Sequence, residues 1–555
     1  MGGGYWNLEF VRLKFVWDLG FGIWSFVRTL DFAPGPFKTP GVFSARASFY
    51  SQWRTSLRPF GVLRENDLPP EALLQNIWHH QRLLRDELKL TDGRIVRVLH
   101  PGFWNHGAGP DFREAVLQFG SEPPVTGDVE IDLQLSGWKA HGHDRNPNFK
   151  NVRLHVLWES AAGEKSLPTL ALRPFLDAPL VELALWLTTD AAQKYPEGLL
   201  GQCAGPLRDL SLTQLEQLLN EAALVRFERK AADLHARARQ CGWEQSLWEG
   251  MLRALGYRHN VWPMQRVGEL RGRLLAVGQA PPPVTVHQAP PLGEPAGEGA
   301  RDTNASRGRL AHSGSSSLIA VQARLLGLSG LLPHDLTRQQ RSADTYLRTV
   351  WDHWWRERDA FSDCALPKTL WKLNGLRPAN HPHRRLALAA HWAGDAKLFK
   401  RIDQWFITTQ PDKALDESLL KCLQPEADEF WSRHWTLRSA AMPKPQPLLG
   451  ATRATDLAIN VILPWLWLRA REGGNAKLQA EAERRYFVWP AAEDNSVLRL
   501  ARDRLLGGRR DVKLANAAMQ QGVLQVVSDF CHHSNALCAD CKFPELVKNW
   551  RVGAA

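Results

Sequence analysis

The stretch at residues 128–135 constrains the fold more than any other part of the chain, because polar and apolar residues alternate in it without a break. Strict alternation is typical of a half-buried β-strand, whose side chains point in turn to opposite faces. The apolar positions then face the protein core: Val129, Ile131, Leu133 and Leu135. The polar positions share the other face: Asp128, Glu130, Asp132 and Gln134. We therefore expect a sheet in which one strand carries three carboxylates on one face.

Carboxylates that stand this close together repel one another, and a divalent cation is a common compensation. A fourth acid, Asp111, follows a glycine-rich turn at residues 105–110 and would complete the cluster. Hard oxygen ligands favour Mg²⁺ or Mn²⁺ over Zn²⁺. The sequence thus predicts a magnesium or manganese site built from Asp111, Glu130 and Asp132.

The order of these acids resembles the PD-(D/E)xK nuclease superfamily, in which a Pro-Asp pair is followed by a strand that carries a Glu. The resemblance implies that Asp111 and Glu130 hold the metal, and that a Lys two residues after the Glu helps to activate water. Asp132 stands at the position of that Lys. Three residues that follow the strand are candidates to replace it: Lys139, His141 and His143.

The superfamily often takes one further acid from a helix that precedes the sheet, and Glu71 is the matching residue here. Pro69 and Pro70 precede it, and apolar residues then recur at helical spacing, so a helix is expected to begin at Glu71. An acid in the first turn of a helix is also favoured by the helix dipole alone. Both interpretations of Glu71, metal ligand and helix-stabilising surface residue, stay open.

Several longer motifs are similar to a bacterial family that is catalogued only as a domain of unknown function with a PD-(D/E)xK nuclease-like core. They are Gly-Pro-Asp-Phe at 109–112, Gly-Asp-Val-Glu-Ile at 127–131, His-Gly-His-Asp at 141–144, Leu-Arg-Pro-Ala-Asn-His-Pro at 376–382 and Cys-x6-Cys-x2-Cys at 531–541. The resemblance runs from about residue 48 to the C-terminus and is interrupted by one linker. It implies an α/β nuclease-like core followed by a large, mostly α-helical region.

Hydrophobic periodicity divides the chain into an α/β part and a helical part. Strands are expected at 95–99, 115–119, 128–135 and 152–158, and helices at 210–219, 222–240, 245–255, 318–332, 343–355, 384–393 and 396–407. A stretch rich in Pro, Gly and Ser separates the helices and predicts a flexible linker. The expected domains are an N-terminal extension (1–65), a PD-(D/E)xK-like domain (66–200), a helical segment (201–273), the linker (274–317) and a helical domain with the C-terminal cysteines (318–555).

Composition points to a nucleic-acid partner and to the cytoplasm. The 69 basic and 58 acidic residues give a net charge of +11, which suits a polyanionic partner such as DNA. Seven cysteines are few and odd in number for 555 residues, which argues against a disulfide scaffold and for a reducing compartment. No uninterrupted apolar run approaches the length of a membrane span, so no membrane partner is expected.

A second group of polar residues lies at the expected start of a helix near Pro382. Cations close to a helix N-terminus can form a phosphate site. The candidates for phosphate contacts are Arg377, Asn380, Arg384 and Arg385. A basic helix start without any ligand explains the same residues equally well.

The C-terminus carries the third constellation, in which Cys538 and Cys541 have the spacing of two thiolates on one metal ion and Cys531 adds a third. The fourth ligand is expected to be Cys203, with His532 or His533 as substitutes. Four cysteines suit either zinc or an iron–sulfur cluster.

The function predicted from these patterns is a metal-dependent nuclease that hydrolyses phosphodiester bonds in DNA. A competing hypothesis follows from Asp132 at the lysine position: a catalytically inactive nucleic-acid-binding or scaffold protein on a nuclease-like fold.

Overall fold

The computed structural model describes residues 46–56, 63–105, 107–160, 167–187, 200–257, 259–276, 313–343, 345–507, 509, 511–531, 538 and 541–553. All of these residues belong to the unit Pro40–Ala555. The N-terminal stretch at 1–45, most of the predicted linker (277–312), and His532 and His533 lie outside the described residues.

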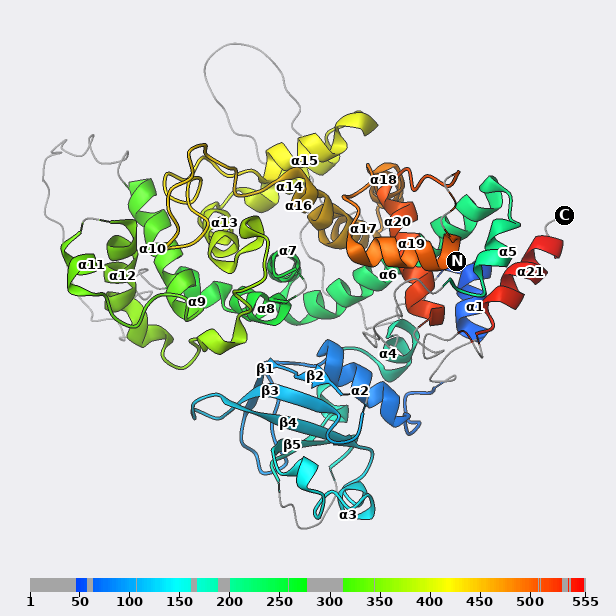
Figure 1. Ribbon diagram of the computed structural model, residues 1–555, viewed down its shortest axis with the longest axis horizontal. Helices are drawn as coiled ribbons and strands as arrows, with labels where there is room; N and C mark the ends of the chain where they lie inside the picture. The colour runs from blue at the N-terminus through cyan, green and yellow to red at the C-terminus, as the bar shows by residue number, and fades with distance from the viewer. Residues whose placement is uncertain are drawn as a thin grey trace, which may run out of the picture. The chain divides into compact units, whose positions relative to one another are not determined.

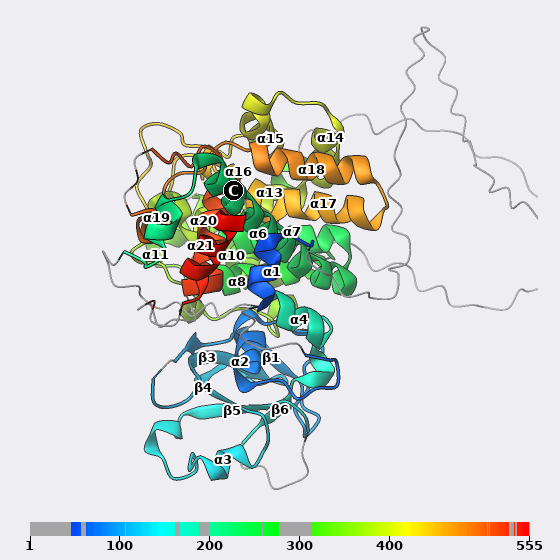
Figure 2. The ribbon, with the colours of Figure 1, turned by 90° about the vertical axis from the view of Figure 1, so that its right-hand side faces the viewer.

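The α/β part is built on one six-stranded sheet (Figures 1 and 2). Its strands are β1 (Val96–His100), β2 (Phe103–Trp104), β3 (Phe112–Phe119), β4 (Val125–Asp132), β5 (Val152–Leu157) and β6 (Thr169–Ala171). The order is β1-β3-β4-β5-β6, with β2 paired to β3. β3 runs antiparallel to β1 and β4, whereas β5 runs parallel to β4 and β6. The sheet is therefore mixed, and it curls into a half-barrel.

The alternation predicted for the acidic strand is present in β4. Val129 and Ile131 belong to the hydrophobic core of the α/β part, which also contains apolar residues of α2 (Glu71–His80) and α4 (Leu180–Trp186). Glu130 and Asp132 alternate with them along the strand. β4 ends at Asp132, three residues earlier than expected, because the chain turns there toward α3 (Gly137–Ala140).

The helical region begins with α5 (Ala204–Arg208) and α6 (Leu212–Cys241). α6 is one helix where two were expected. The side chain of Ser211 and that of Gln214 form a capping box at its start, and Gly242, with φ of +84°, ends it. No helix-breaking residue lies between, so the helix runs uninterrupted through 220 and 221.

The other helices confirm a mostly α-helical second half. They are α1 (Phe49–Ser56), α7 (Trp243–Leu255), α8 (Val261–Glu269), α9 (Arg271–Ala276), α10 (Ser313–Leu328), α11 (Arg338–Ser342), α12 (Tyr346–Glu357), α13 (Pro382–Gly394), α14 (Leu398–Ile407), α15 (Leu415–Leu423), α16 (Ala451–Leu457), α17 (Leu463–Glu472), α18 (Ala476–Val488), α19 (Ser496–Leu506), α20 (Ala517–Val526) and α21 (Phe543–Gly553). Two π-helical turns, η7 (Ala458–Ile462) and η8 (Val527–Cys531), interrupt this pattern.

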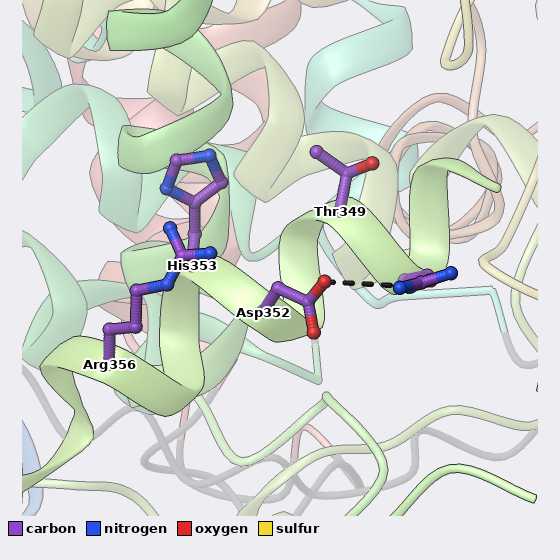
Figure 3. A pocket seen from close by; sticks show the side chains of 5 residues that line it. Thr349, Asp352, His353 and Arg356 are labelled. Carbon is purple, nitrogen blue, oxygen red and sulfur yellow. Dashed lines mark ion pairs between the residues drawn. The ribbon is translucent and has the colours of Figure 1, made fainter. Parts of the chain in front are cut away.

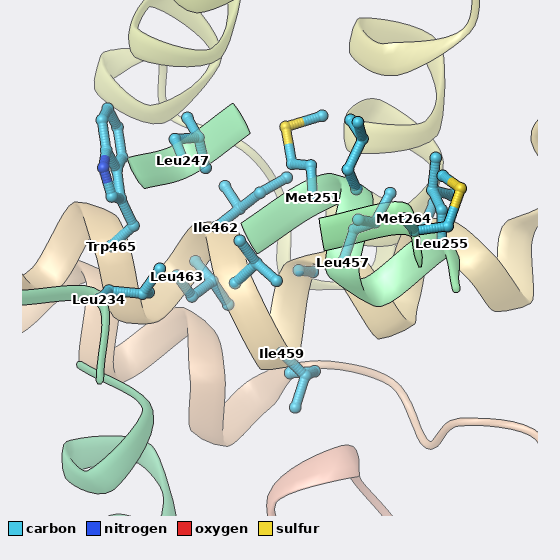
Figure 4. Packing of buried hydrophobic residues seen from close by; sticks show 14 of the residues in the cluster. Leu234, Leu247, Met251, Leu255, Met264, Leu457, Ile459, Ile462, Leu463 and Trp465 are labelled. Carbon is cyan, nitrogen blue, oxygen red and sulfur yellow. The ribbon is translucent and has the colours of Figure 1, made fainter. Parts of the chain in front are cut away.

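The core of the helical region is close-packed around α6, α7 and the α16–η7–α17 segment (Figure 4). Leu247, Met251 and Ile462 are fully buried there, and Trp465 adds a polar contact by donating from Nε1 to the carbonyl of Trp243 over 3.0 Å. Among the residues that the structure describes, we find no helix with both the length and the apolar character of a membrane span.

Candidate functional site

The predicted acids converge from three elements of the α/β part. Glu71 begins α2, Asp111 directly precedes β3, and Glu130 lies within β4. Gln75, one helical turn after Glu71, joins the first two: its Nε2 donates to Asp111 Oδ1 over 2.9 Å and to Glu71 Oε1 over 3.3 Å. No sequence motif marks Gln75 as a site residue, although its i, i+4 spacing from Glu71 places it on the same helix face.

Asp111 and Glu130 are locked to one another by reciprocal backbone contacts. The backbone N–H of Asp111 donates to Glu130 Oε2 over 3.1 Å, and the N–H of Ile131 donates to Asp111 Oδ2 over 3.1 Å. Each carboxylate thus accepts a hydrogen bond from the backbone of the segment that carries the other. These bonds fix both side chains at the same end of β3 and β4.

The pKa values of Asp111 and Glu130 are both strongly raised. Burial, followed by repulsion from Asp111, Asp132 and Glu71, raises the pKa of Glu130 to about 9. Burial also raises the pKa of Asp111 to about 7, and the nearby Glu71 and Asp132 add to this effect. The pKa of Glu71 is raised as well, first by burial and then by Asp132. Because the cause is partly mutual repulsion, positive charge brought into the cluster would relieve it.

Asp132 is the most enclosed of the acids, with 2% of its surface exposed. On one side, its Oδ2 lies 2.9 Å from Nε2 of the buried His155 on β5. On the other side, its Oδ1 lies 3.3 Å from Nδ1 of His141. His155 is therefore a hydrogen-bonded strand residue.

Residues 136–150, which we call the histidine loop, cover this end of the acidic strand. In Figures 1 and 2 its helix α3 lies next to β5. His143 stacks on Phe149 with ring centroids 4.0 Å apart, and the edge of Trp138 meets His143 at 5.4 Å. The His143 side chain is nine-tenths buried. Its Nδ1 lies 3.3 Å from Glu130 Oε1 but is not aligned for a hydrogen bond and has no other partner.

One set of side chains in this site has the spacing of metal ligands. One donor atom each from Asp132, His141 and His143 lies within 4.8 Å of the others. Within the described part of the chain, no other three His, Cys, Asp or Glu residues meet this spacing. The structure brings the predicted ligands Asp111, Glu130 and Asp132 into one electrostatic cluster. The group with the spacing of metal ligands, however, combines Asp132 with His141 and His143 instead of Asp111 and Glu130.

Two other strand and loop residues lie outside this set. Asp128, on the same face of β4, accepts a hydrogen bond from the backbone N–H of Glu114 over 3.1 Å. Glu114 has φ of +58° in a β-bulge, so Asp128 stabilises an irregular backbone. Lys139 is exposed on α3. It shares the histidine loop with two further exposed cations, Arg145 and Lys150, of which Arg145 lies 3.8 Å from Asp144.

The predicted phosphate contacts at the start of α13 find other partners. Arg384 is 1% exposed and donates to backbone carbonyls of a single connection: Trp431, His434, Gln446 and Pro447. Arg385, 4% exposed, donates to the Leu448 carbonyl and to Asn380 Oδ1. Arg377 is exposed and lies 3.4 Å from Glu493. Arg384 and Arg385 are thus buried and donate to groups of the chain itself, and phosphate binding at the start of α13 stays a prediction.

A polar pocket of about 270 Å³ lies along α12 (Figure 3). It is lined by Arg348, Thr349, Asp352, His353 and Arg356. Arg348 and Asp352 pair across one turn at 3.6 Å. The lining comes from a single helix face, and none of the predicted site residues belongs to it.

Comparison with known proteins gives a family and no function. The family model described as Protein of unknown function (DUF2851) matches residues 71–272 and 308–495. No curated protein and no solved structure matches the chain. The matched ranges include Glu71, Asp111, Glu130 and the histidine loop.

Proposed function

The chain belongs to the family described as Protein of unknown function (DUF2851), and we propose that it is a metal-dependent nuclease that hydrolyses phosphodiester bonds in DNA. The observation that carries the proposal is the grouping of Asp132, His141 and His143 within 4.8 Å beside a carboxylate pair of raised pKa. Among the residues that the structure describes, the ion pairs of Glu130 and Asp132 are all with histidines: His143, His141 and His155. A bound divalent metal would supply positive charge, polarise a phosphate and lower the pKa of a water molecule.

The residues around the proposed ligands support this chemistry. His155 holds Asp132 in one orientation, as outer partners commonly do for ligating carboxylates. Glu130 faces Nδ1 of His143 and can orient that ring in the same way. Held in this way through Nδ1, the ring would bind a metal through Nε2.

The donor set also indicates which metal the site prefers. Mg²⁺ takes oxygen ligands almost exclusively, whereas Mn²⁺ and later metals accept imidazole nitrogen as well. With two histidines and one carboxylate, we expect Mn²⁺ to support more activity than Mg²⁺. This shifts the expectation from magnesium toward manganese.

A polyanionic substrate fits the rim of the site. Lys139, Arg145 and Lys150 are exposed on the histidine loop, and the whole chain carries a net charge of +11. The likeness of Asp111 and Glu130 to the metal-binding acids of PD-(D/E)xK nucleases points to the same substrate class. Because His141 and His143 are among the proposed metal ligands, Lys139 of the histidine loop is left as the candidate for the role of the missing lysine.

The test is cleavage of single- and double-stranded DNA by the full chain with Mn²⁺, with Mg²⁺ and with a chelator. Asp132→Asn keeps the shape of the side chain and removes the charge, and we expect it to lower the cleavage rate at least about a hundredfold. Asp128→Asn is the matched control, since Asp128 lies on the same face of β4 and serves the bulge at Glu114. It is expected to cleave at nearly the wild-type rate.

Cleavage that persists in the chelator, or in Asp132→Asn at the wild-type rate, would refute the proposal. A wild-type protein that binds DNA and one Mn²⁺ per chain but cleaves no nucleic acid would support the competing hypothesis of an inactive nucleic-acid-binding protein. That hypothesis is favoured by one observation, the buried Asp132 at the place of the superfamily's lysine.

A further inference from the structure

Four of the seven cysteines come together in the helical region, away from the acidic site. Cys203, at the start of α5, is 4% exposed, and Cys531 and Cys538 are 4% and 7% exposed. Cys541 is half-buried immediately before α21. α5, which begins directly after Cys203, packs against both α19 and α21, and α21 begins two residues after Cys541.

The backbone around these cysteines departs from regular α-helix. Cys531 ends the π-helical turn η8, a rare element that is frequent at functional sites. Cys538 adopts φ of +58°, an unusual conformation for a residue with a side chain. The backbone N–H of Cys541 donates to the carbonyl of Cys538 over 3.4 Å, which makes the tight Cys-x2-Cys turn.

Arg504 of α19 lies among the sulfurs. Its Nη2 donates to Cys538 Sγ over 3.2 Å, and its side chain also hydrogen-bonds Cys531. Its carbonyl accepts from the N–H of Gly201 over 2.9 Å, and a β-carbon at Gly201 would meet both that carbonyl and Cys203 Sγ. A buried thiol is normally neutral. The positive charge of a buried guanidinium that donates to the sulfur favours the thiolate form instead.

We propose that Cys203, Cys531, Cys538 and Cys541 are the ligands of a structural metal centre, either one zinc ion or an iron–sulfur cluster. Either centre is held by four thiolates and carries a net negative charge once they are bound. The positive charge of Arg504 would stabilise it. A closed set of four protein ligands leaves no open position, so the centre is structural. It is independent of the acidic site and of the nuclease proposal.

The two kinds of centre hold their thiolates at different spacings. A single tetrahedral zinc with Zn–S bonds of about 2.3 Å would hold its thiolates roughly 4 Å apart. Among the described residues, no three cysteine sulfurs lie within 4.8 Å of one another. An iron–sulfur cluster binds its four thiolates through different iron atoms and holds them further apart.

The centre would join distant parts of the chain. Cys203 follows the α/β part, whereas the other three cysteines lie in the last 25 residues or so of the 555. α21 and α19 both pack against α5, the helix that begins after Cys203. Metal ligation at this junction restricts a very long loop in the unfolded chain, so removal of the metal is expected to lower the melting temperature.

The experiment measures zinc, iron and acid-labile sulfide per chain in the full-length protein purified anaerobically, together with its visible absorption spectrum. Iron and sulfide in similar amounts with a brown colour identify the cluster, and about one zinc without iron identifies the single ion. The absence of all three from the wild-type protein, also after anaerobic reconstitution with iron and sulfide or with zinc, would overturn the proposal.

Variants then test the ligands. Cys203→Ser and Cys541→Ser are each expected to lose most of the metal and to lower Tm by several degrees. Cys364→Ser is the matched control: Cys364 is as buried as Cys538, but its thiol donates to the Phe361 carbonyl and is not one of the four proposed ligands. Full metal content in Cys203→Ser would exclude this residue as a ligand and contradict the four-cysteine centre. If either variant fails to fold, the metal content of the wild type still decides.

Discussion

Gly137 shows how tightly single residues are fitted at the candidate site. A β-carbon at this position would lie 2.5 Å from Asp132 Oδ1 and 3.1 Å from Asp132 Cβ. The missing side chain therefore leaves room for the carboxylate between His155 and His141. Sequence patterns placed the acids on the correct face of β4, but they could not reveal this contact, because it depends on how the chain turns after the strand.

Gly137→Ala tests the importance of that contact. The added methyl group displaces the Asp132 carboxylate, so we expect the affinity for Mn²⁺ to fall about tenfold or more, while the free energy of unfolding changes by no more than about 1–3 kcal/mol. The readout is the rise in Tm that Mn²⁺ causes. Gly107→Ala is the control, since its β-carbon would meet nothing nearer than 3.5 Å. A wild-type response to Mn²⁺ in Gly137→Ala would show that Asp132 tolerates displacement.

Among the elements, α13 depends on a buried cation. Arg384 points from the first turn of this helix into the connection at residues 431–447 and donates to its carbonyls. Its ring neighbour is Trp435, at 4.7 Å from the guanidinium carbon. These carbonyls have no helix or sheet to satisfy them, so the arginine replaces regular secondary structure in a long irregular stretch.

Arg384→Met is expected to destabilise the protein by about 3–5 kcal/mol, because it leaves several buried carbonyls without donors. Urea denaturation followed by circular dichroism measures this change. Arg377→Met is the matched control on the same approach; its side chain is 78% exposed, and a change within about 0.5 kcal/mol is expected. Equal stabilities for the two variants would mean that Arg384 is not a structural residue.

For the molecule as a whole, periodicity in the sequence predicted much of the fold. The strands near 95–99, 115–119 and 152–158 are present, as are the helices of the second half. Short elements without a pattern, β2 and β6, were missed, since two or three residues carry too little periodicity. The likeness to a domain-of-unknown-function family is confirmed by the family match over most of the chain.

Long-range contacts were beyond the reach of the sequence alone. Gln75 and Arg504 join residues that are far apart in the chain, and no local pattern marks these contacts. The same holds for the N-terminal helix α1, where the hydroxyl of Tyr50 donates to Asp529 over 2.9 Å and Arg54 pairs with the same carboxylate. Residue type and spacing named the candidate ligands, and only the fold showed that His141 and His143 gather around Asp132.

Binding of a divalent cation by Asp132, His141 and His143 underlies the proposed function. Titration of the chelator-treated protein with Mn²⁺, followed by electron paramagnetic resonance, counts the bound ions directly and does not require a substrate. We expect one tight Mn²⁺ site per chain in the wild type and in Asp128→Asn. In Asp132→Asn and His143→Ala, we expect the affinity for Mn²⁺ to be at least about tenfold weaker. Equal binding by all four proteins, or no binding by the wild type, would contradict the proposed site.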